Sequence, residues 1–278
     1  MRTLTQRLGT SGTISAVIIL ATLLAIIFAV WISPFADPGA ETPNLAARFS
    51  PPSMDYWLGT DSRGRDIVSR ILLGGQVSVT IGLTVVLLAL CIGLPIGIIA
   101  GYAGGWVDEV LMRITDVFLA FPALLLSVLL AAALGAGMVN CIIAISISWW
   151  PWYARIARAE VLSLRNAPYV EAAQIMGVST PVILWRHILP SVSGPLGVQA
   201  ALDFGPALLT ASALSFLGLG VAPPIPDWGA MVNEGRAVFP ERWWISVMPG
   251  LAIFGLALAF SLLGDAMRSA AKRGSDAA

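Results

Sequence analysis

The chain carries few charges. Of its 278 residues, 12% are charged and 57% are hydrophobic. A soluble globular domain usually has about 25% charged residues, so a chain of this composition lacks the polar surface that water would require. Its sixteen cationic residues include a single lysine, Lys272, and the formal net charge is zero. A neutral chain is not expected to bind nucleic acid.

The residue patterns of enzyme active sites are also missing. A Walker A loop needs Gly-Lys followed by Ser or Thr, but Lys272 lies between Ala and Arg. His187 is the only histidine and has no metal-ligand spacing around it, and no GxSxG or HExxH motif is present. Cys91 and Cys141 lie in apolar runs, where we expect small hydrophobes and not a disulfide. We therefore expect a non-catalytic chain that binds no metal and no cofactor of its own.

What the sequence does contain is long apolar runs. Each is close to the roughly 20 residues that a helix needs to cross about 30 Å of hydrocarbon. The runs are apolar on all faces, whereas barrel strands would alternate apolar and polar residues. We predict an all-α polytopic membrane protein with six transmembrane helices. The predicted spans are Ile14–Ser33, Val77–Ala100, Val117–Gly135, Met138–Ala154, Pro195–Leu217 and Ile245–Leu263.

The first run could be a signal peptide, because Arg2 and Arg7 precede it. It is long enough to span, however, and ends without a clear small-x-small cleavage site, so we expect a retained anchor helix. With the N-terminus in the cytoplasm, ten Arg and Lys residues fall inside and six outside, which places both termini in the cytoplasm. The expected domains are the anchor and extracytoplasmic loop (1–75), the membrane core (76–265) and a cytoplasmic tail (266–278).

Two segments beside the second span have their own patterns. Gly93, Gly97 and Gly101 form overlapping GxxxG spacings, which predict close packing of two helices. Flexibility near a helix end is the alternative. Asp61–Leu73 carries apolar and charged residues that suit opposite faces, and we expect an amphipathic segment that lies in the membrane interface; the apolar residues are Ile67, Ile71 and Leu72, and the charged ones Arg63, Asp66 and Arg70.

The longest cytoplasmic stretch is the polar segment Glu160–Pro190. Within it, Tyr169–Met176 has helix-forming residues, Pro168 suits the first turn, and Gly177 suits a C-terminal stop. A second helical stretch, Pro181–Ile188, follows. Two short helices joined at a glycine predict a compact knob below the membrane.

The knob has an apolar ridge, which we predict to be exposed. It consists of Val170, Ala173, Ile175 and Met176, and the small side chains of Ala172 and Ala173 would allow close contact with a groove on another protein. An amphipathic helix that lies on the bilayer surface explains the same pattern. The residues alone leave both interpretations open.

One motif in this segment resembles a known family. Glu171–Gly177 reads EAA-x₃-G and is followed by Leu189–Pro190, which is similar to the cytoplasmic EAA loop of ABC importer permeases. That loop inserts into a cleft on the ATPase subunit. The general pattern has Ile where this chain has His187. The ATPase-coupling residues that the resemblance implies are Tyr169, Glu171, Ala172, Ala173, Gly177 and Pro190.

Further segments resemble the dipeptide and oligopeptide branch of these permeases. They are Leu58–Val79, Gly101–Pro122 and Leu214–Arg236, and the likeness covers nearly all of 58–265. The order of segments resembles the C-type subunit of a permease pair. The resemblance implies a type I importer fold in the bacterial inner (plasma) membrane. It also implies four kinds of partner: a second homologous permease, cytoplasmic ATPase subunits that bind ATP and Mg²⁺, an extracytoplasmic solute-binding protein, and lipid.

Asp203 is the only ionisable residue deep within a predicted span. A carboxylate there is costly and usually faces a cavity or a partner, so we expect it to line the translocation path; a hydrogen-bonded structural role is the alternative. The function predicted is a permease subunit for di- or oligopeptides or related small solutes, with alternating access driven by the separate ATPase. An ion-coupled secondary transporter that uses Asp203 is the rival, although no convincing internal repeat supports it.

Overall fold

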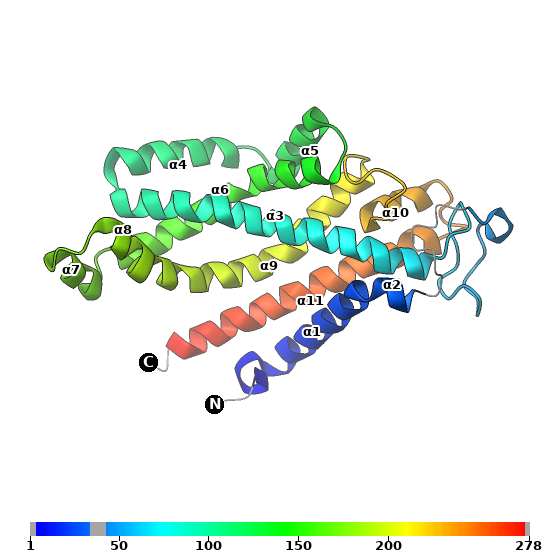
Figure 1. Cartoon of the computed structure of the whole chain (residues 1–278), viewed down its shortest axis with the longest axis horizontal. Helices are drawn as coiled ribbons and strands as arrows, with labels where there is room; N and C mark the ends of the chain where they lie inside the picture. The colour runs from blue at the N-terminus through cyan, green and yellow to red at the C-terminus, as the bar shows by residue number, and fades with distance from the viewer. Residues whose placement is uncertain (1–3, 34–42, 276–278) are drawn as a thin grey trace.

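The computed structural model describes residues 4–33 and 43–275, and nearly all regular structure in these ranges is helical (Figure 1). A single bridge between Thr60 and Asp66 is the extended pairing found there. The elements are α1 (Leu4–Ile27), α2 (Ala29–Ile32), a 3₁₀ turn (Leu45–Ala47), α3 (Ile67–Ala103), α4 (Gly105–Leu119), α5 (Ala123–Leu134), α6 (Met138–Leu164), α7 (Pro168–Ile175), α8 (Thr180–Ile183), a π-helical turn (Leu184–Ile188), α9 (Leu189–Phe216), α10 (Trp228–Arg236) and α11 (Trp244–Ser275).

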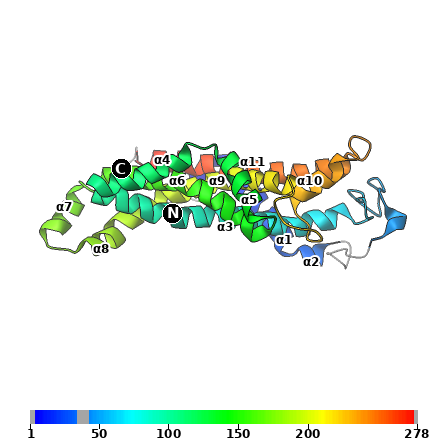
Figure 2. The same cartoon turned by 90° about the horizontal axis from the view of Figure 1, so that it is seen from above.

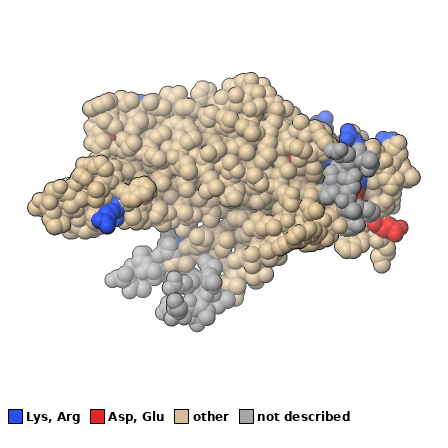
Figure 3. All heavy atoms as spheres, viewed as in Figure 1, with Lys and Arg blue, Asp and Glu red and all other residues tan. Residues whose placement is uncertain are grey.

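The helices form an elongated bundle. In two perpendicular views, α7 and α8 lie at one end, whereas α10 and the segment before α3 lie at the other (Figures 1 and 2). On the face drawn in Figure 3, charged atoms gather mainly near these two ends, and the middle carries almost none. Such a distribution fits a protein whose middle is surrounded by lipid.

Among the described residues, three helices are long and apolar enough to cross a membrane. These are the Gly9–Ile27 part of α1, all of α3, and Trp244–Ala270 in α11. The pair α4 and α5 adds a fourth if it is counted as one broken span. The six-helix prediction therefore has direct support for three or four spans by length and hydropathy.

The predicted span Val117–Gly135 is wrong as a single helix. It is interrupted between Leu119 and Ala123, and the two helices on either side meet at 83°. The cause is local: Pro122 disfavours helical backbone at the residue before it, Phe121.

The glycine spacing predicted the closest helix pair correctly. Gly93, Gly97 and Gly101 all face α6. A Cβ atom on Gly97 would lie 2.4 Å from the backbone oxygen of Ala154, and one on Gly93 would lie 2.5 Å from that of Trp150. No side chain fits in these places, so the two backbones are in direct contact and α3 and α6 pack as one unit.

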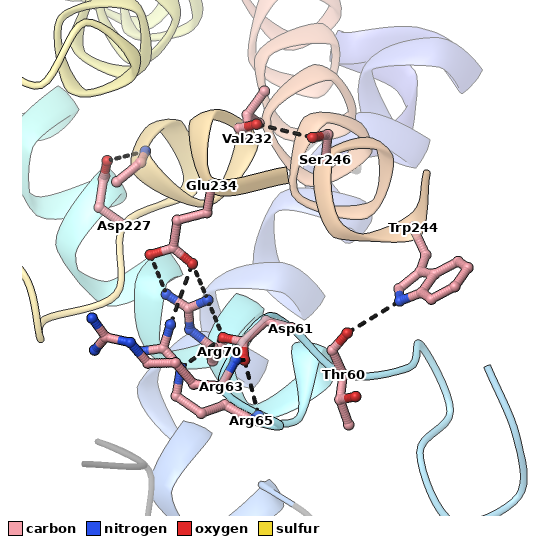
Figure 4. A network of polar contacts seen from close by, with 11 residues as sticks. Thr60, Asp61, Arg63, Arg65, Arg70, Asp227, Val232, Glu234, Trp244 and Ser246 are labelled. Carbon is pink, nitrogen blue, oxygen red and sulfur yellow. Dashed lines mark hydrogen bonds and ion pairs between the residues drawn. The ribbon is translucent and has the colours of Figure 1, made fainter. Parts of the chain in front are cut away.

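Three buried charged groups and the partly exposed Glu234 hold the end of the molecule at which α10 lies (Figure 4). Asp61 Oδ2 lies 2.6 Å from Arg65 Nε and 2.7 Å from Arg70 Nη1, and Arg70 Nη1 lies 2.6 Å from Glu234 Oε2 on α10. The two cations and two anions balance. Burial and the neighbouring Arg70 lower the pKa of Arg65, which the carboxylates partly oppose. This ion cluster joins the start of α3 to α10.

The amphipathic interface segment predicted at Asp61–Leu73 is therefore wrong. Asp66 is the N-cap of α3 and accepts hydrogen bonds from the backbone and hydroxyl of Ser69, both at 2.8 Å. Ile67 and Arg70 are buried. Burial raises the pKa of Asp66. The charged residues of this segment pair with each other and with α10, which a pattern based on one segment does not reveal.

Removing one member of the ion cluster should destabilise the fold. Asp61→Ala leaves Arg65 and Arg70 buried with one carboxylate between them, and breaking a buried pair this way costs about 3–5 kcal/mol. Thermal unfolding of the purified protein in detergent should show a clearly lower Tm. Asp55→Ala, at an exposed carboxylate at the same end, is the matched control. An equal Tm for the two variants would contradict the role of the cluster.

Candidate functional site

The knob, defined as residues 168–188, projects at the end of the bundle opposite α10 (Figures 1 and 2). α7 begins with Pro168 in its first turn, and Ala167 before it has extended backbone. The helix stops at Ile175, and Gly177 follows with φ +75°. Proline is favoured at a helix start and glycine just past a helix end. The predicted start and stop of this helix are confirmed.

The outward face of α7 differs from the predicted ridge. Val170 and Ala173, three residues apart on one helical face, are 0% and 2% exposed and pack into the core of the protein. The prediction that these two are exposed is wrong. Ile175 and Met176 are 87% and 75% exposed, and Tyr169 is half-exposed. The most exposed apolar surface of α7 is therefore at its end, which is called the tip of the knob below, and Trp185 in the π turn adds a further exposed apolar side chain.

The EAA residues divide between the two faces. Glu171 and Ala172 are exposed, whereas Ala173 is the inward-facing member. Glu171 lies in the first turn of α7, where the helix dipole favours a carboxylate. An exposed carboxylate beside a small alanine leaves room for another chain to approach closely.

Side-chain contacts connect the knob to α3. The Gln174 amide on α7 donates to the hydroxyl of Tyr102 at 3.1 Å, and Arg165, just before α7, donates to the carbonyl of Gly101 at 3.3 Å. Both acceptors lie in the last turns of α3. α7 is therefore attached to α3, which also packs against α6.

The segment that connects the knob to α9 is less regular than a continuous α-helix. The second helical stretch starts at Thr180, but it becomes a π-helical turn at Leu184–Ile188 before α9 begins. The His187 ring lies 6.3 Å from the Tyr169 ring, centroid to centroid, and Ile188 is fully buried. Pro190, in the first turn of α9, is exposed. π turns often occur at functional sites.

Ion pairs hold α4 against α6 near the same end. Asp108 forms a two-pronged pair with Arg158 at 2.5 and 2.6 Å, and Asp116 contacts Arg155 at 2.6 Å. Glu109 and Arg113, four residues apart on α4, lie 3.9 Å from each other and are mostly exposed, so this pair contributes little. The strong partners of Asp108 and Asp116 therefore lie on α6 and not on their own helix.

Asp203 lies in a group of polar side chains, of which the sequence pointed only to Asp203 itself. Gln199, one turn earlier on α9, donates to Asp203 Oδ1 at 2.8 Å, and Arg268 of α11 donates to Gln199 Oε1 at 3.3 Å. The Tyr153 hydroxyl of α6 faces Asp203. Gln199 and Asp203 are four residues apart on one helix, so their contact could have been predicted from the sequence. Arg268 and Tyr153 belong to helices far away in the sequence, so their place here could not.

No group of three or more potential metal ligands occurs among the described residues. The exposed knob, the helical bundle and the carboxylate of Asp203 within α9 are features expected of a membrane permease, and comparison with known proteins agrees. Residues 93–273 match the family described as "Binding-protein-dependent transport system inner membrane component", and the chain belongs to this family.

Curated relatives extend the likeness beyond the family match. The probable D,D-dipeptide transport system permease protein DdpC of Escherichia coli K12 is 45% identical over 254 residues, which cover 91% of this chain and 84% of the relative. The glutathione transport system permease protein GsiD of Pectobacterium atrosepticum is 43% identical over 249 residues, which cover 89% and 83%. The chain is therefore a permease subunit of an ABC importer.

A solved structure shares the fold. A chain of the inward-facing MetNI methionine ABC transporter aligns with a TM-score of 0.57 and 16% identity, covering 71% of this chain and 94% of that one. At this level of identity the likeness concerns the fold alone. It supports the type I importer architecture that the sequence predicted.

Proposed function

We propose that this chain is the C-type permease subunit of an ABC importer that carries di- or oligopeptides or related small solutes. The observation that carries the proposal is the knob, whose EAA residues end in an exposed apolar tip, at one end of a chain similar to dipeptide and glutathione permeases. A second permease, cytoplasmic ATPase subunits and an extracytoplasmic solute-binding protein complete the importer. ATP and Mg²⁺ bind to the ATPase partners.

The proposed topology has six spans, formed by α1, α3, the bent pair α4 and α5, α6, α9 and α11, in the bacterial inner membrane. The start of α1 and the end of α11 both lie toward the end of the bundle that carries the knob (Figure 1). With the knob in the cytoplasm, both ends of the chain are cytoplasmic as well. The ion cluster and α10 then face the solute-binding protein.

Movement of the ATPase is transmitted to the permease through the two connections of the knob, one to α6 and one to α9. α6 ends at Leu164, and only the short segment 165–167 separates it from α7. Because α3 and α6 pack backbone to backbone, they move with α7 as one body. The π turn separates α7 and α8 from α9 and lets α9 respond differently. ATP drives the cycle if the two permease conformations differ in affinity for the closed ATPase pair.

The exposed tip favours an interpretation in which the knob docks on a protein over one in which α7 lies on the bilayer surface. The inward face of α7, with Val170 and Ala173, is already covered by the chain itself. The most exposed large apolar side chains on α7 and just after it are Ile175 and Met176, whereas Tyr169 at its start is about half-exposed. A helix that lay on the bilayer would present an apolar face along its length, whereas a terminal apolar tip fits into a cleft.

A charge at the tip should release the ATPase. Ile175→Asp places a carboxylate in the proposed cleft, and the loss of one such anchor commonly weakens an interface by tenfold or more, about 1.4 kcal/mol. Co-purification of the ATPase in mild detergent measures this effect. The matched control is Leu45→Asp, at a 69% exposed residue in the 3₁₀ turn that contacts Thr60 at the opposite end. Equal recovery of the ATPase with both variants would contradict docking through the tip.

A further inference from the structure

We propose that an arginine clamp, at the end of the molecule opposite the knob, binds a carboxylate on the docking face of the solute-binding protein. The clamp consists of Arg48 and Arg242, whose guanidiniums both lie against the ring of Phe49. The inference rests on the proposed function, because it takes the importer to work with a solute-binding protein. It gives that partner a defined chemical contact on this chain.

The exposed arginines at this end lack anionic partners, in contrast to the buried ones. Arg65 and Arg70 are buried, and both form ion pairs within the ion cluster. Four exposed arginines of this end form no ion pair with any residue in the described part of the chain: Arg48, Arg63, Arg236 and Arg242. The exposed carboxylates described at this end are Asp55 and Glu241. The described surface here therefore carries an excess of positive charge, which fits an acidic partner.

Two of these arginines converge on one aromatic ring. Arg48 Cζ lies 4.8 Å and Arg242 Cζ 5.6 Å from the centre of the Phe49 ring, so the two cations are no farther apart than the sum of these distances. The ring attracts each cation through its quadrupole, but it has no net charge, and the two guanidiniums still repel each other. A carboxylate that contacts both relieves this repulsion, and guanidinium matches carboxylate geometry through paired N–H···O bonds.

The ring at the centre of the clamp is held in place by the fold. Phe49 has φ +58°, in the left-handed region that is uncommon for a bulky residue, and its N–H donates to the Asp61 carbonyl at 3.1 Å. Arg242 also lies 5.8 Å from the ring of Trp244, whose indole N–H donates to the Thr60 carbonyl at 3.2 Å. Such strained residues persist only where their surroundings fix them, and they cluster at functional sites. The clamp is therefore ordered before a partner binds.

The loop beside the clamp favours a protein over lipid as the partner. Residues 51–58 leave and return next to the clamp, since the Thr60 N–H donates to the Ser50 carbonyl at 3.0 Å. The segment before α3 extends beyond the ends of α2 and α3 (Figure 1), and it exposes Met54 at 94% and Trp57 at 67%. Exposed apolar side chains near arginines are typical of protein interfaces, whose strongest contacts are rich in Trp and Arg. In the proposed topology this end meets the solute-binding protein.

The test measures the Kd of the complete importer for the fluorescently labelled solute-binding protein that supports its uptake, in nanodiscs of phosphatidylcholine. The double variant Arg48→Glu, Arg242→Glu should raise the Kd about tenfold or more, because the clamp then repels the partner's carboxylate. Added salt should weaken binding to the unsubstituted importer more than binding to the variant, since salt screens the attraction that the variant has lost. Unchanged Tm and basal ATPase activity show that the variant is folded. If its Tm falls, the single variants Arg48→Gln and Arg242→Gln replace it.

Arg236→Glu, at an exposed arginine of α10 outside the clamp, is the matched control and should change the Kd far less. Equal Kd values for the clamp variant and the control overturn the inference and leave the importer function intact. An effect that occurs only in nanodiscs containing anionic phosphatidylglycerol assigns the clamp to lipid phosphate and overturns it as well. Failure of the unsubstituted importer to bind any solute-binding protein contradicts the proposed function itself, and with it the inference.

Discussion

Gly177→Val is expected to abolish ATP-dependent uptake while the chain still inserts into the membrane. Gly177 has φ +75°, and no atom lies within 4 Å of where its Cβ would be. The effect therefore comes from backbone strain and not from crowding, because a β-branched residue is very unfavourable in this conformation. The backbone hydrogen bonds that end α7, from Gly177 to Gln174 and from Val178 to Ala173, would be lost. The tip would then point away from its cleft.

Uptake into proteoliposomes measures the result, and the amount of chain in the membrane fraction shows that insertion is retained. Gly194→Ala, at an exposed helical glycine with open space around it, is the control and should transport normally. Glu171→Trp should also abolish uptake, because it places a bulky side chain on the exposed face of α7. Normal uptake by both Gly177→Val and Glu171→Trp would exclude the knob as the coupling element.

Gly97→Leu should have an equally large effect by a different route, since the folded permease itself should be lost. Even the first side-chain atom would lie 2.4 Å from the Ala154 oxygen and 2.6 Å from the Ala157 Cβ. Overpacking typically costs about 1–3 kcal/mol and sometimes more, and here the α3–α6 backbone contact must open to admit the whole side chain.

The yield of monodisperse protein in detergent and its Tm check this prediction. Gly197→Leu is the matched control, because this glycine on α9 has nothing within 4 Å of its Cβ position. Gly97→Leu should fall far below the unsubstituted chain in both measures, and the control should not. Similar yield and Tm for the two variants would show that α3 and α6 are not held together by this contact.

Local features of the sequence predicted the helices well. Long apolar runs identified helical segments, and the spacing of Gly93, Gly97 and Gly101 identified the closest helix pair, because small residues act through direct backbone approach. The break before Ala123 was missed although Pro122 marked it, since the run is apolar on both sides of the break. Asp61–Leu73 was misread because its charges pair with Glu234, more than 150 positions away in the sequence.

For the knob and Asp203, the sequence likewise predicted the local features and missed those that depend on tertiary packing. Pro168 and Gly177 fixed the ends of α7, because their backbone preferences are local. Which face of α7 points inward was not predictable, since apolar residues occur on both faces and the core of the protein decides between them. The neighbours of Asp203 were hidden for a similar reason. Gln199 is on the same helix, but Tyr153, beside the carboxylate, and Arg268, which contacts Gln199, are brought there only by tertiary packing.

The most direct test of the central proposal, that the knob docks on an ATPase, is photo-cross-linking from position 175 in native membranes. A photoreactive residue at Ile175 should cross-link to a protein that carries a Walker A motif, and ATP should change the yield; the same residue at Leu45 should not. The account would be contradicted if position 175 cross-linked to lipid alone and the purified chain by itself took up solute driven by a proton or Na⁺ gradient.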